Sequence, residues 1–233
     1  MENNLDFKVF LFISTKKLII SAFSEKNQNI YRKELIRDKD KNYLNFDDLD
    51  FFLSNHVFRI EKEIKNFVKN ISIILETDDF LPIEISLKKN NYKNIVDLKN
   101  LEYLLKSGKD YCKNTIGNRK IIHMIIENYQ IDSNFYSSLP TDIKANNFSI
   151  DVKIICISNN LIKNFEKIFK KYQITLGKIL NANYVSKFLD NNEEDIFLMA
   201  QKIINGYNPN EVKFVEKASK NRGFYEKFFN FFN

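Results

Sequence analysis

The fold of this chain is decided by the stretch Phe148-Ser-Ile-Asp-Val-Lys-Ile-Ile-Cys-Ile157. Side chains alternate between the two faces of a strand, and here every second residue from Phe148 to Cys156 is apolar. The opposite face begins with polar residues and turns apolar at Ile155 and Ile157. The stretch therefore predicts a strand with one wholly apolar face and a second face that turns apolar towards its end.

The residues around this strand predict an α+β unit that spans 82–182. An amphipathic helix is expected over 161–172, and the strand over 174–180 closes the unit. Upstream, Asp97 is the expected N-cap of a further helix, and residues 120–126 have the apolar run of a strand.

The preceding residues, 1–81, predict a separate α+β unit. Asp47 is the expected N-cap of a helix whose apolar residues recur at i, i+4 and i+7. Apolar runs of strand length occupy 7–13 and 17–23, a third strand is expected over 30–36 after a polar turn, and a buried strand over 71–76. Three strands, a helix and a strand make a compact α+β arrangement.

The residues after the second unit predict three further parts. Residues 183–207 form a helical return segment, in which an amphipathic helix covers 193–206. Residues 208–222 are polar and basic without periodicity, and we expect a linker there. Residues 223–233 predict a short amphipathic helix with an aromatic face.

The aromatic face of 223–233 predicts attachment to a membrane surface. Such a face has to dock on the body, on a partner or in a membrane interface, and bulky aromatic residues beside basic ones favour the interface. The expected membrane-binding residues are Phe224, Tyr225, Phe228, Phe229, Phe231, Phe232, Lys220, Arg222 and Lys227. The alternative is a helix that folds back on the body as a last core element.

The composition is that of a soluble globular protein. Of the 233 residues, 44% are hydrophobic and 28% are charged, and the net charge is +6. This charge suits anionic lipid or nucleic acid, but it is scattered over both units without an aromatic and basic strand signature, so no nucleic-acid partner is expected. No apolar run approaches the roughly 18 residues of a spanning helix. Cys112 and Cys156 are expected to be reduced core thiols of a cytosolic body.

No catalytic, cofactor or metal site is predicted. Phosphate binding needs glycine-rich turns, whereas the 5 glycines of this chain are scattered. His56 and His123 have no Cys, Asp or Glu at ligand spacing, so a structural role is expected for both. No Ser or Cys nucleophile stands beside a base. The rival interpretation is a degenerate ATPase in which Lys16 and Lys17 contact a phosphate.

A resemblance to a known family rests on Arg119-Lys-Ile-Ile-His123-Met-Ile-Ile-Glu-Asn-Tyr129-Gln-Ile-Asp132. This segment resembles the Arg-x-x-x-His-x-ϕ-ϕ-x-x-Tyr-x-ϕ-Asp segment, where ϕ is apolar, of FtsA-like bacterial cell-division proteins of the actin-like superfamily. In that family it lies in the inserted 1C, or SHS2-type, subdomain. Pro140 and the elements over 148–180 continue the pattern. The aromatic helix resembles the family's membrane-targeting sequence.

The resemblance covers most of residues 5–190 and the terminal aromatic segment. It implies an α+β fold with a partial actin-like 1A unit, an inserted 1C-like subdomain and a C-terminal amphipathic helix. The chain departs from the family at the phosphate loops. The first loop of the family is Asp-x-Gly-Ser/Thr-x-Lys, and the equivalent turn here, Phe12-Ile-Ser-Thr-Lys-Lys17, lacks the carboxylate and the glycine. The second loop has no counterpart.

The resemblance implies a non-catalytic, nucleotide-free adaptor of the division apparatus, peripheral to the cytoplasmic side of the inner membrane at the division site. Its expected partners are anionic lipids, other division proteins and further copies of itself. FtsZ binding is the expectation for the family, whereas the 2B subdomain that carries it has no counterpart here. The rivals are a residual ATP-binding actin-like protein and a relative of the pilus-assembly member of the superfamily.

Overall fold

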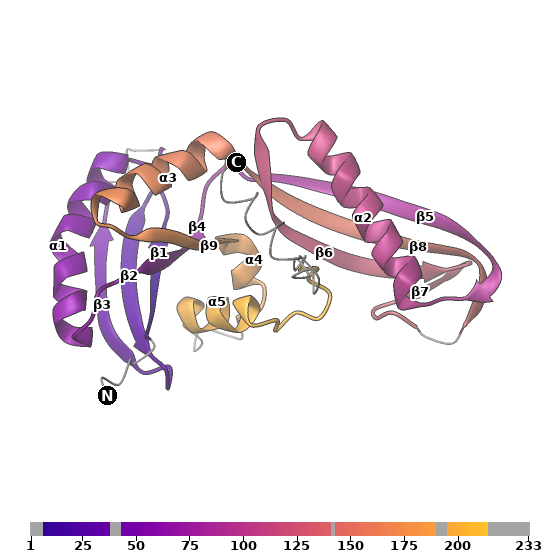
Figure 1. Ribbon diagram of the computed structural model, residues 1–233, viewed down its shortest axis with the longest axis horizontal. Helices are drawn as coiled ribbons and strands as arrows, with labels where there is room; N and C mark the ends of the chain where they lie inside the picture. Colours follow the sequence, from indigo (N-terminus) through magenta and orange to yellow (C-terminus); the bar gives the residue numbers. More distant parts are fainter. Residues whose placement is uncertain (1–6, 38–42, 141–142, 190–194, 214–233) are drawn as a thin grey trace, which may run out of the picture.

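The computed structural model describes residues 7–37, 43–140, 143–189 and 195–213, which form a mixed α+β molecule with two sheets. The first sheet has the strand order β3-β2-β1-β4-β9, and the second has the order β5-β8-β6-β7. Figure 1 shows the two sheets following each other along the long axis of the molecule. The predicted α+β class is confirmed.

The first unit contains the first sheet and the helices that cover it. In chain order its elements are β1 (Phe7–Ile13), β2 (Lys17–Ser24), β3 (Asn29–Ile36), α1 (Phe46–Ile64), β4 (Asn70–Leu75), α3 (Asn159–Lys171), β9 (Thr175–Asn181), α4 (Ala182–Ser186) and α5 (Ile196–Ile204). Strands β1, β4 and β9 are parallel, and β1–β2–β3 are antiparallel. Helices α1 and α3 pack on one face of the sheet, and α4 and α5 pack on the other.

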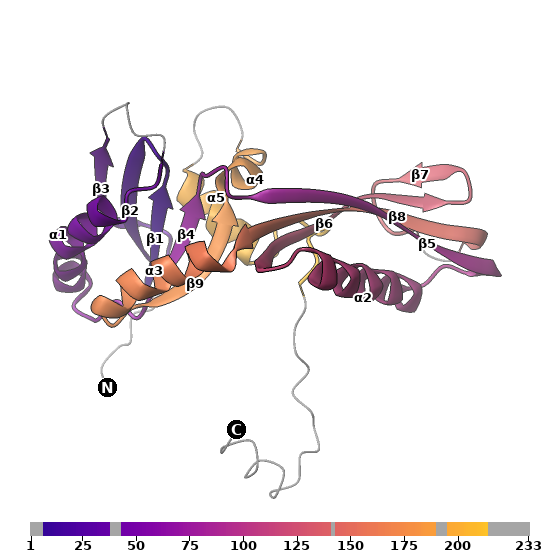
Figure 2. The same ribbon diagram turned by 90° about the horizontal axis from the view of Figure 1, so that it is seen from above.

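The second unit is an insertion between β4 and α3 of the first unit. Its elements are β5 (Leu81–Ile95), α2 (Leu98–Thr115), β6 (Arg119–Ile131), β7 (Asn134–Tyr136) and β8 (Lys144–Ser158). All of its strand pairs are antiparallel, and α2 covers one face of the sheet. Figure 2 shows this unit projecting from the first, with α2 along one side.

Strand β8 connects the two units, as its alternation of apolar residues leads one to expect. Phe148, Ile150 and the following alternate residues are buried in the core under α2. Ile155 is buried in the core under α4 and α5, and Ile157 in the core under α1 and α3. The prediction of a face that turns apolar is therefore confirmed, because the end of β8 enters the first unit.

The structure corrects the expected extent of the second unit. The sequence predicts that residues 161–180 belong to the unit 82–182, but β9 pairs in parallel with β4 of the first sheet. Helix α3 begins directly after β8 and packs beside α1. The cause is the insertion: α3 and β9 complete a β4–α3–β9 crossover that the second unit interrupts.

Two local expectations also change. The N-cap of α1 is Asn45 rather than Asp47, because the Asn45 side chain accepts hydrogen bonds from the N–H groups of Asp47 and Asp48. Helix α5 is shorter than the expected 193–206 and is capped by Asp195. Strands β5 and β7 were not predicted, although Ile83, Ile85 and Leu87 alternate within β5.

Candidate interaction site at the junction of the two units

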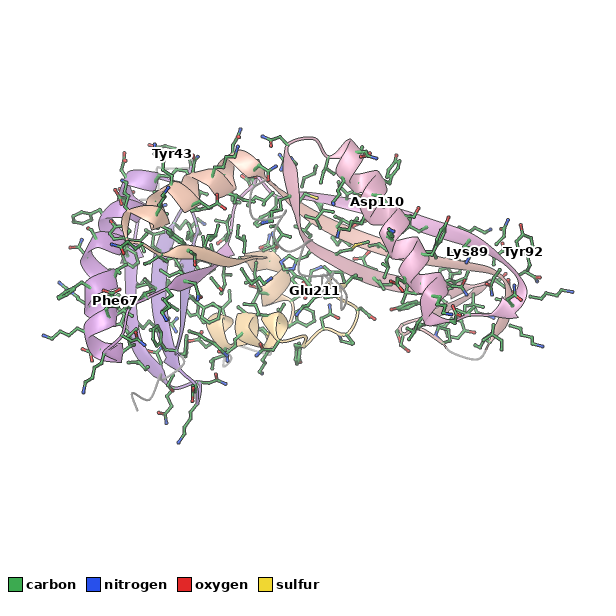
Figure 3. The ribbon with its side chains drawn as sticks, viewed as in Figure 1. Tyr43, Phe67, Lys89, Tyr92, Asp110 and Glu211 are labelled. Atoms are coloured by element: carbon green, nitrogen blue, oxygen red, sulfur yellow. The ribbon has the colours of Figure 1, made fainter. Side chains whose placement is uncertain are left out.

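The junction of the two units is held by a buried pair of side chains. His123 lies on β6, and Glu211 lies in the segment that follows α5; Figure 3 shows Glu211 between the units. The His123 Nδ1 and Glu211 Oε1 atoms are 2.7 Å apart, and the side chains are only 3% and 8% exposed. This contact joins residues that are 88 positions apart in the sequence.

The other ring nitrogen of His123 is also engaged. The backbone N–H of Asn181, at the end of β9, donates to His123 Nε2 over 3.1 Å. Nε2 is therefore the acceptor, and Nδ1 carries the hydrogen that the Glu211 carboxylate accepts. In a catalytic His–Glu pair Nε2 is the atom that accepts a proton from the substrate. Here the Asn181 N–H occupies Nε2, so His123 links β6 to β9 and to Glu211.

Tyr184 of α4 completes the buried cluster. Its hydroxyl donates to Glu211 Oε2 over 3.2 Å and accepts from Asn208 Nδ2 over 2.9 Å. The ring packs on His123, with 4.5 Å between the ring centroids. Burial raises the pKa of the Tyr184 hydroxyl far above its usual range, so it stays protonated as a donor.

The segment 208–213 runs along the edge of β6, and we call it the strap. The Val212 N–H donates to the Met124 carbonyl over 2.8 Å, and the Ile126 N–H donates to the Asn210 carbonyl over 2.9 Å. The expected linker 208–222 therefore begins with residues that are bonded to the body. Glu211 sits at the centre of the strap, opposite Ile125 in an antiparallel bridge.

The turn between β1 and β2, the equivalent of the family's first phosphate loop, is closed by its own hydrogen bonds. Ser14 Oγ accepts from the N–H groups of Lys16 and Lys17, at 3.2 and 3.0 Å. The Ser14 N–H donates to the Lys17 carbonyl, and the buried Arg37 guanidinium donates to the Ser14 carbonyl. These N–H groups would have to be released before they bound a phosphate.

The predicted membrane-binding residues, Lys220, Arg222, Phe224, Tyr225, Lys227, Phe228, Phe229, Phe231 and Phe232, lie outside the described residues. Among the described residues, no helix combines the length and apolarity that membrane crossing requires. In the same part of the chain, no three His, Cys, Asp or Glu side chains are grouped so as to hold a metal ion.

The two cysteines and the two histidines that the sequence singled out lie in different surroundings. Cys112 and Cys156 are buried free thiols, and burial raises the pKa of both, that of Cys156 to about 11. They are therefore poor nucleophiles at neutral pH. His56 of α1 contacts Tyr31, whose hydroxyl lies 2.7 Å from His56 Nδ1. His123 is buried and hydrogen-bonded to Glu211 and to the Asn181 N–H.

Sequence reasoning missed Glu211, Tyr184 and Asn181, which are the partners of His123. Spacing along the chain gave no signal for Glu211, because a strand edge brings it to β6 from a segment without periodicity. A weak signal existed at Asn181, an N-cap residue directly after Ile179 and Leu180, whose side chain accepts from the Tyr184 N–H.

No protein-family model matches the chain, and no curated protein matches it. Among solved structures, the chain is similar to the cytoplasmic domain of EpsL, an inner-membrane component of the type II secretion system of Vibrio cholerae. The identity is 8%, the match covers 80% of this chain and 61% of the chain of that domain, and the TM-score is 0.42.

Two further solved structures are similar. The first is a PilM–PilN type IV pilus biogenesis complex, at 7% identity, 78% coverage of this chain, 49% of the other and a TM-score of 0.45. The second, at 16% identity, 78% and 55% coverage and a TM-score of 0.31, is a Bacteroides thetaiotaomicron protein with an actin-like ATPase fold and unknown function. The chain thus spans 49% to 61% of these structures' lengths. With every TM-score below 0.5, these likenesses assign no function.

Proposed function

We propose that this protein is a non-catalytic adaptor, peripheral to the cytoplasmic side of a bacterial inner membrane, that binds proteins of the cell-division apparatus. The aromatic face of 223–233 is the proposed membrane anchor. The two units supply the proposed contacts with division proteins and with further copies of the chain. The proposal includes no metal, nucleotide or nucleic acid.

The observation that carries the proposal is the open face of the second sheet. In Figure 2, α2 lies along one face, and none of the described elements covers the outer part of the other. That face is polar and ordered by cross-strand contacts: Ser86 Oγ donates to Asp151 over 2.6 Å, and Ser149 Oγ donates to Gln130 over 3.1 Å. A projecting unit with an ordered, solvated sheet face suits protein binding.

The closed β1–β2 turn favours an adaptor over the rival ATP-binding protein. Ser14 occupies the N–H groups of Lys16 and Lys17. Nucleotide hydrolysis also needs carboxylates for Mg²⁺ near the phosphates, and the turn has none. We expect calorimetric titration of the full chain with Mg-ATP to give no binding heat. Micromolar affinity would contradict this part of the proposal.

The anchor is expected to bind reversibly. Full burial of one Phe contributes roughly 1.5–3 kcal/mol, and interfacial burial contributes less. A basic residue near an anionic leaflet adds about 1 kcal/mol. A helix of this length is marginal in water and has to fold on the surface, which costs conformational entropy. Several assembled copies would therefore bind a membrane much more strongly than one.

Vesicle co-sedimentation of the full chain tests the proposal. The wild type is expected to sediment with vesicles that contain phosphatidylglycerol, and much less with purely zwitterionic vesicles. Phe228→Asp/Phe232→Asp is expected to abolish the binding. The matched control is Phe51→Asp/Phe58→Asp, which changes two exposed aromatic residues of α1 and should leave binding unchanged. Equal sedimentation of the wild type and the 228/232 variant would refute the anchor.

The alternative partner set is that of a pilus-assembly relative. This alternative keeps the proposed adaptor role and differs in the protein that is bound. A pull-down with purified FtsZ and the full chain distinguishes a direct division-ring link from binding to other components. Saturable, salt-resistant capture would support the link.

A further inference from the structure

A groove of about 450 Å³ lies between two strand edges at the junction. One wall is β6 around Ile121–Met124, and the other is β9 around Lys178–Leu180. Ile203 and Ile204, at the end of α5, add further apolar surface. The groove lies between the two sheets, so it belongs to neither core alone.

Part of each wall is a strand edge without a strand partner among the described residues. Strand β9 is the last strand of the first sheet. On β6, β7 pairs with residues 129–131 and the strap is bonded at 124–126, which leaves the edge open at 119–123. A bulge at Ile122 leaves this residue without a register partner on β8. Exposed strand edges of this kind are templates for another strand.

The strap leads directly into the groove. The strap runs antiparallel to β6: Asn210 lies opposite Ile126, and Val212 lies opposite Met124. A continuation of the chain in the same direction would therefore meet Ile122. Val212 and Lys213 already line the groove. Lys213 Nζ donates to the Ile203 and Ile204 carbonyls, at 3.0 and 2.6 Å, which fixes the end of the strap at the mouth.

The next residues of the sequence have the composition that this groove requires. They are Phe214-Val215-Glu216-Lys217, two apolar residues of high strand propensity followed by an acid and a base. The apolar lining suits Phe214 and Val215. The groove lining holds three lysines (Lys109, Lys178 and Lys213) and one carboxylate (Glu211), and this excess of positive charge complements Glu216.

We propose that this groove is the docking site for Phe214–Lys217 of the same chain, which adds as a strand along β6 between the two sheets. As a consequence, the residues that follow Lys217 would leave the body of the protein from a fixed position. If 223–233 is the membrane anchor, which rests on the proposed function above, the anchor emerges at the joint between the units. Docking itself does not depend on lipid.

Hydrogen exchange in the full chain, without vesicles, tests the docking. Phe214→Asp/Val215→Asp is expected to raise the exchange rate of groove-facing amides in residues 119–124 at least tenfold, because the added strand is lost. Phe224→Asp/Tyr225→Asp is the matched control and should leave these amides unchanged. Equal exchange in the wild type and the 214/215 variant would overturn the proposal.

A second measurement identifies the occupant. Phe214→Cys with Lys178→Cys is expected to form an intramolecular disulfide at least ten times faster than Phe224→Cys with Lys178→Cys. Cys112 and Cys156 are buried and should not compete. Intermolecular cross-links, or protection that rises with protein concentration, would assign the groove to a second copy and overturn the proposal. Vesicle binding without docking would leave the anchor standing and refute only the docking.

Discussion

The two sheets of the molecule are covered differently. Helices α1 and α3 cover one face of the first sheet, and α4 and α5 cover the other, whereas α2 is the one helix among residues 7–213 as described that covers the second sheet. Its other face is apolar where Ile125 and Ile155 meet the first unit and polar further out. The first sheet is therefore buried on both faces, whereas the outer part of one face of the second sheet stays exposed.

The largest effect is expected in the first unit. Phe165 of α3 is fully buried, and its ring lies 5.3 Å from that of Phe46. Phe165→Ala should lower the free energy of unfolding by about 3–5 kcal/mol, because it leaves a cavity. Denaturant unfolding measures the change. Phe58→Ala, on the exposed side of α1, is the control and should change the free energy of unfolding by no more than about 0.5 kcal/mol. Similar losses in both variants would contradict the assignment of Phe165 to the core.

The buried cluster at the junction of the two units should show an intermediate loss of stability. Glu211→Ala leaves the buried His123 Nδ1–H without an acceptor, which costs about 1–3 kcal/mol. Glu211→Gln keeps an acceptor oxygen and should cost less. Chemical unfolding of both variants measures the difference. If neither variant were destabilised, the cluster would not hold the units together.

A smaller, pH-dependent effect is expected where α1 meets α3. Lys171 Nζ lies 2.5 Å from Asp50 Oδ2, and its hydrogen bond lowers the pKa of the Asp50 carboxyl. Stability from a lowered pKa is present above the unfolded-state value of about 3.9 and is lost as the pH falls through the folded-state value. Asp50→Asn should therefore cost about 0.2–1 kcal/mol at pH 7 and less at pH 3.

Unfolding measurements at both pH values check this prediction. A destabilisation that stayed the same at pH 3 would assign the effect to the Tyr172 hydroxyl, which also donates to Asp50, rather than to the carboxylate charge.

The smallest effect is expected on the open face of the second sheet. Ser86→Ala removes one exposed hydrogen bond to Asp151 and should change the free energy of unfolding by no more than about 0.5 kcal/mol. Thermal unfolding checks this value. A loss of several kcal/mol would show that this face is structural and would remove the difference between the two sheets.

The parts of the molecule that were predictable are those with local patterns. The alternation from Phe148 to Cys156 predicts both β8 and its change of environment at Ile155, because the spacing of the apolar residues along this one segment reports which of its faces are buried. The insertion was harder, since nothing in residues 161–180 says that β9 pairs with β4. Glu211 was not predictable, because its role depends on a strand edge far away in sequence.

The most direct test of the adaptor proposal is the location of the full chain in dividing bacterial cells. The proposal predicts that a fluorescent fusion lies on the inner membrane and concentrates at the division site, and that Phe228→Asp/Phe232→Asp makes it diffuse. A wild-type fusion that is diffuse, or that is unaffected by these substitutions, would contradict it.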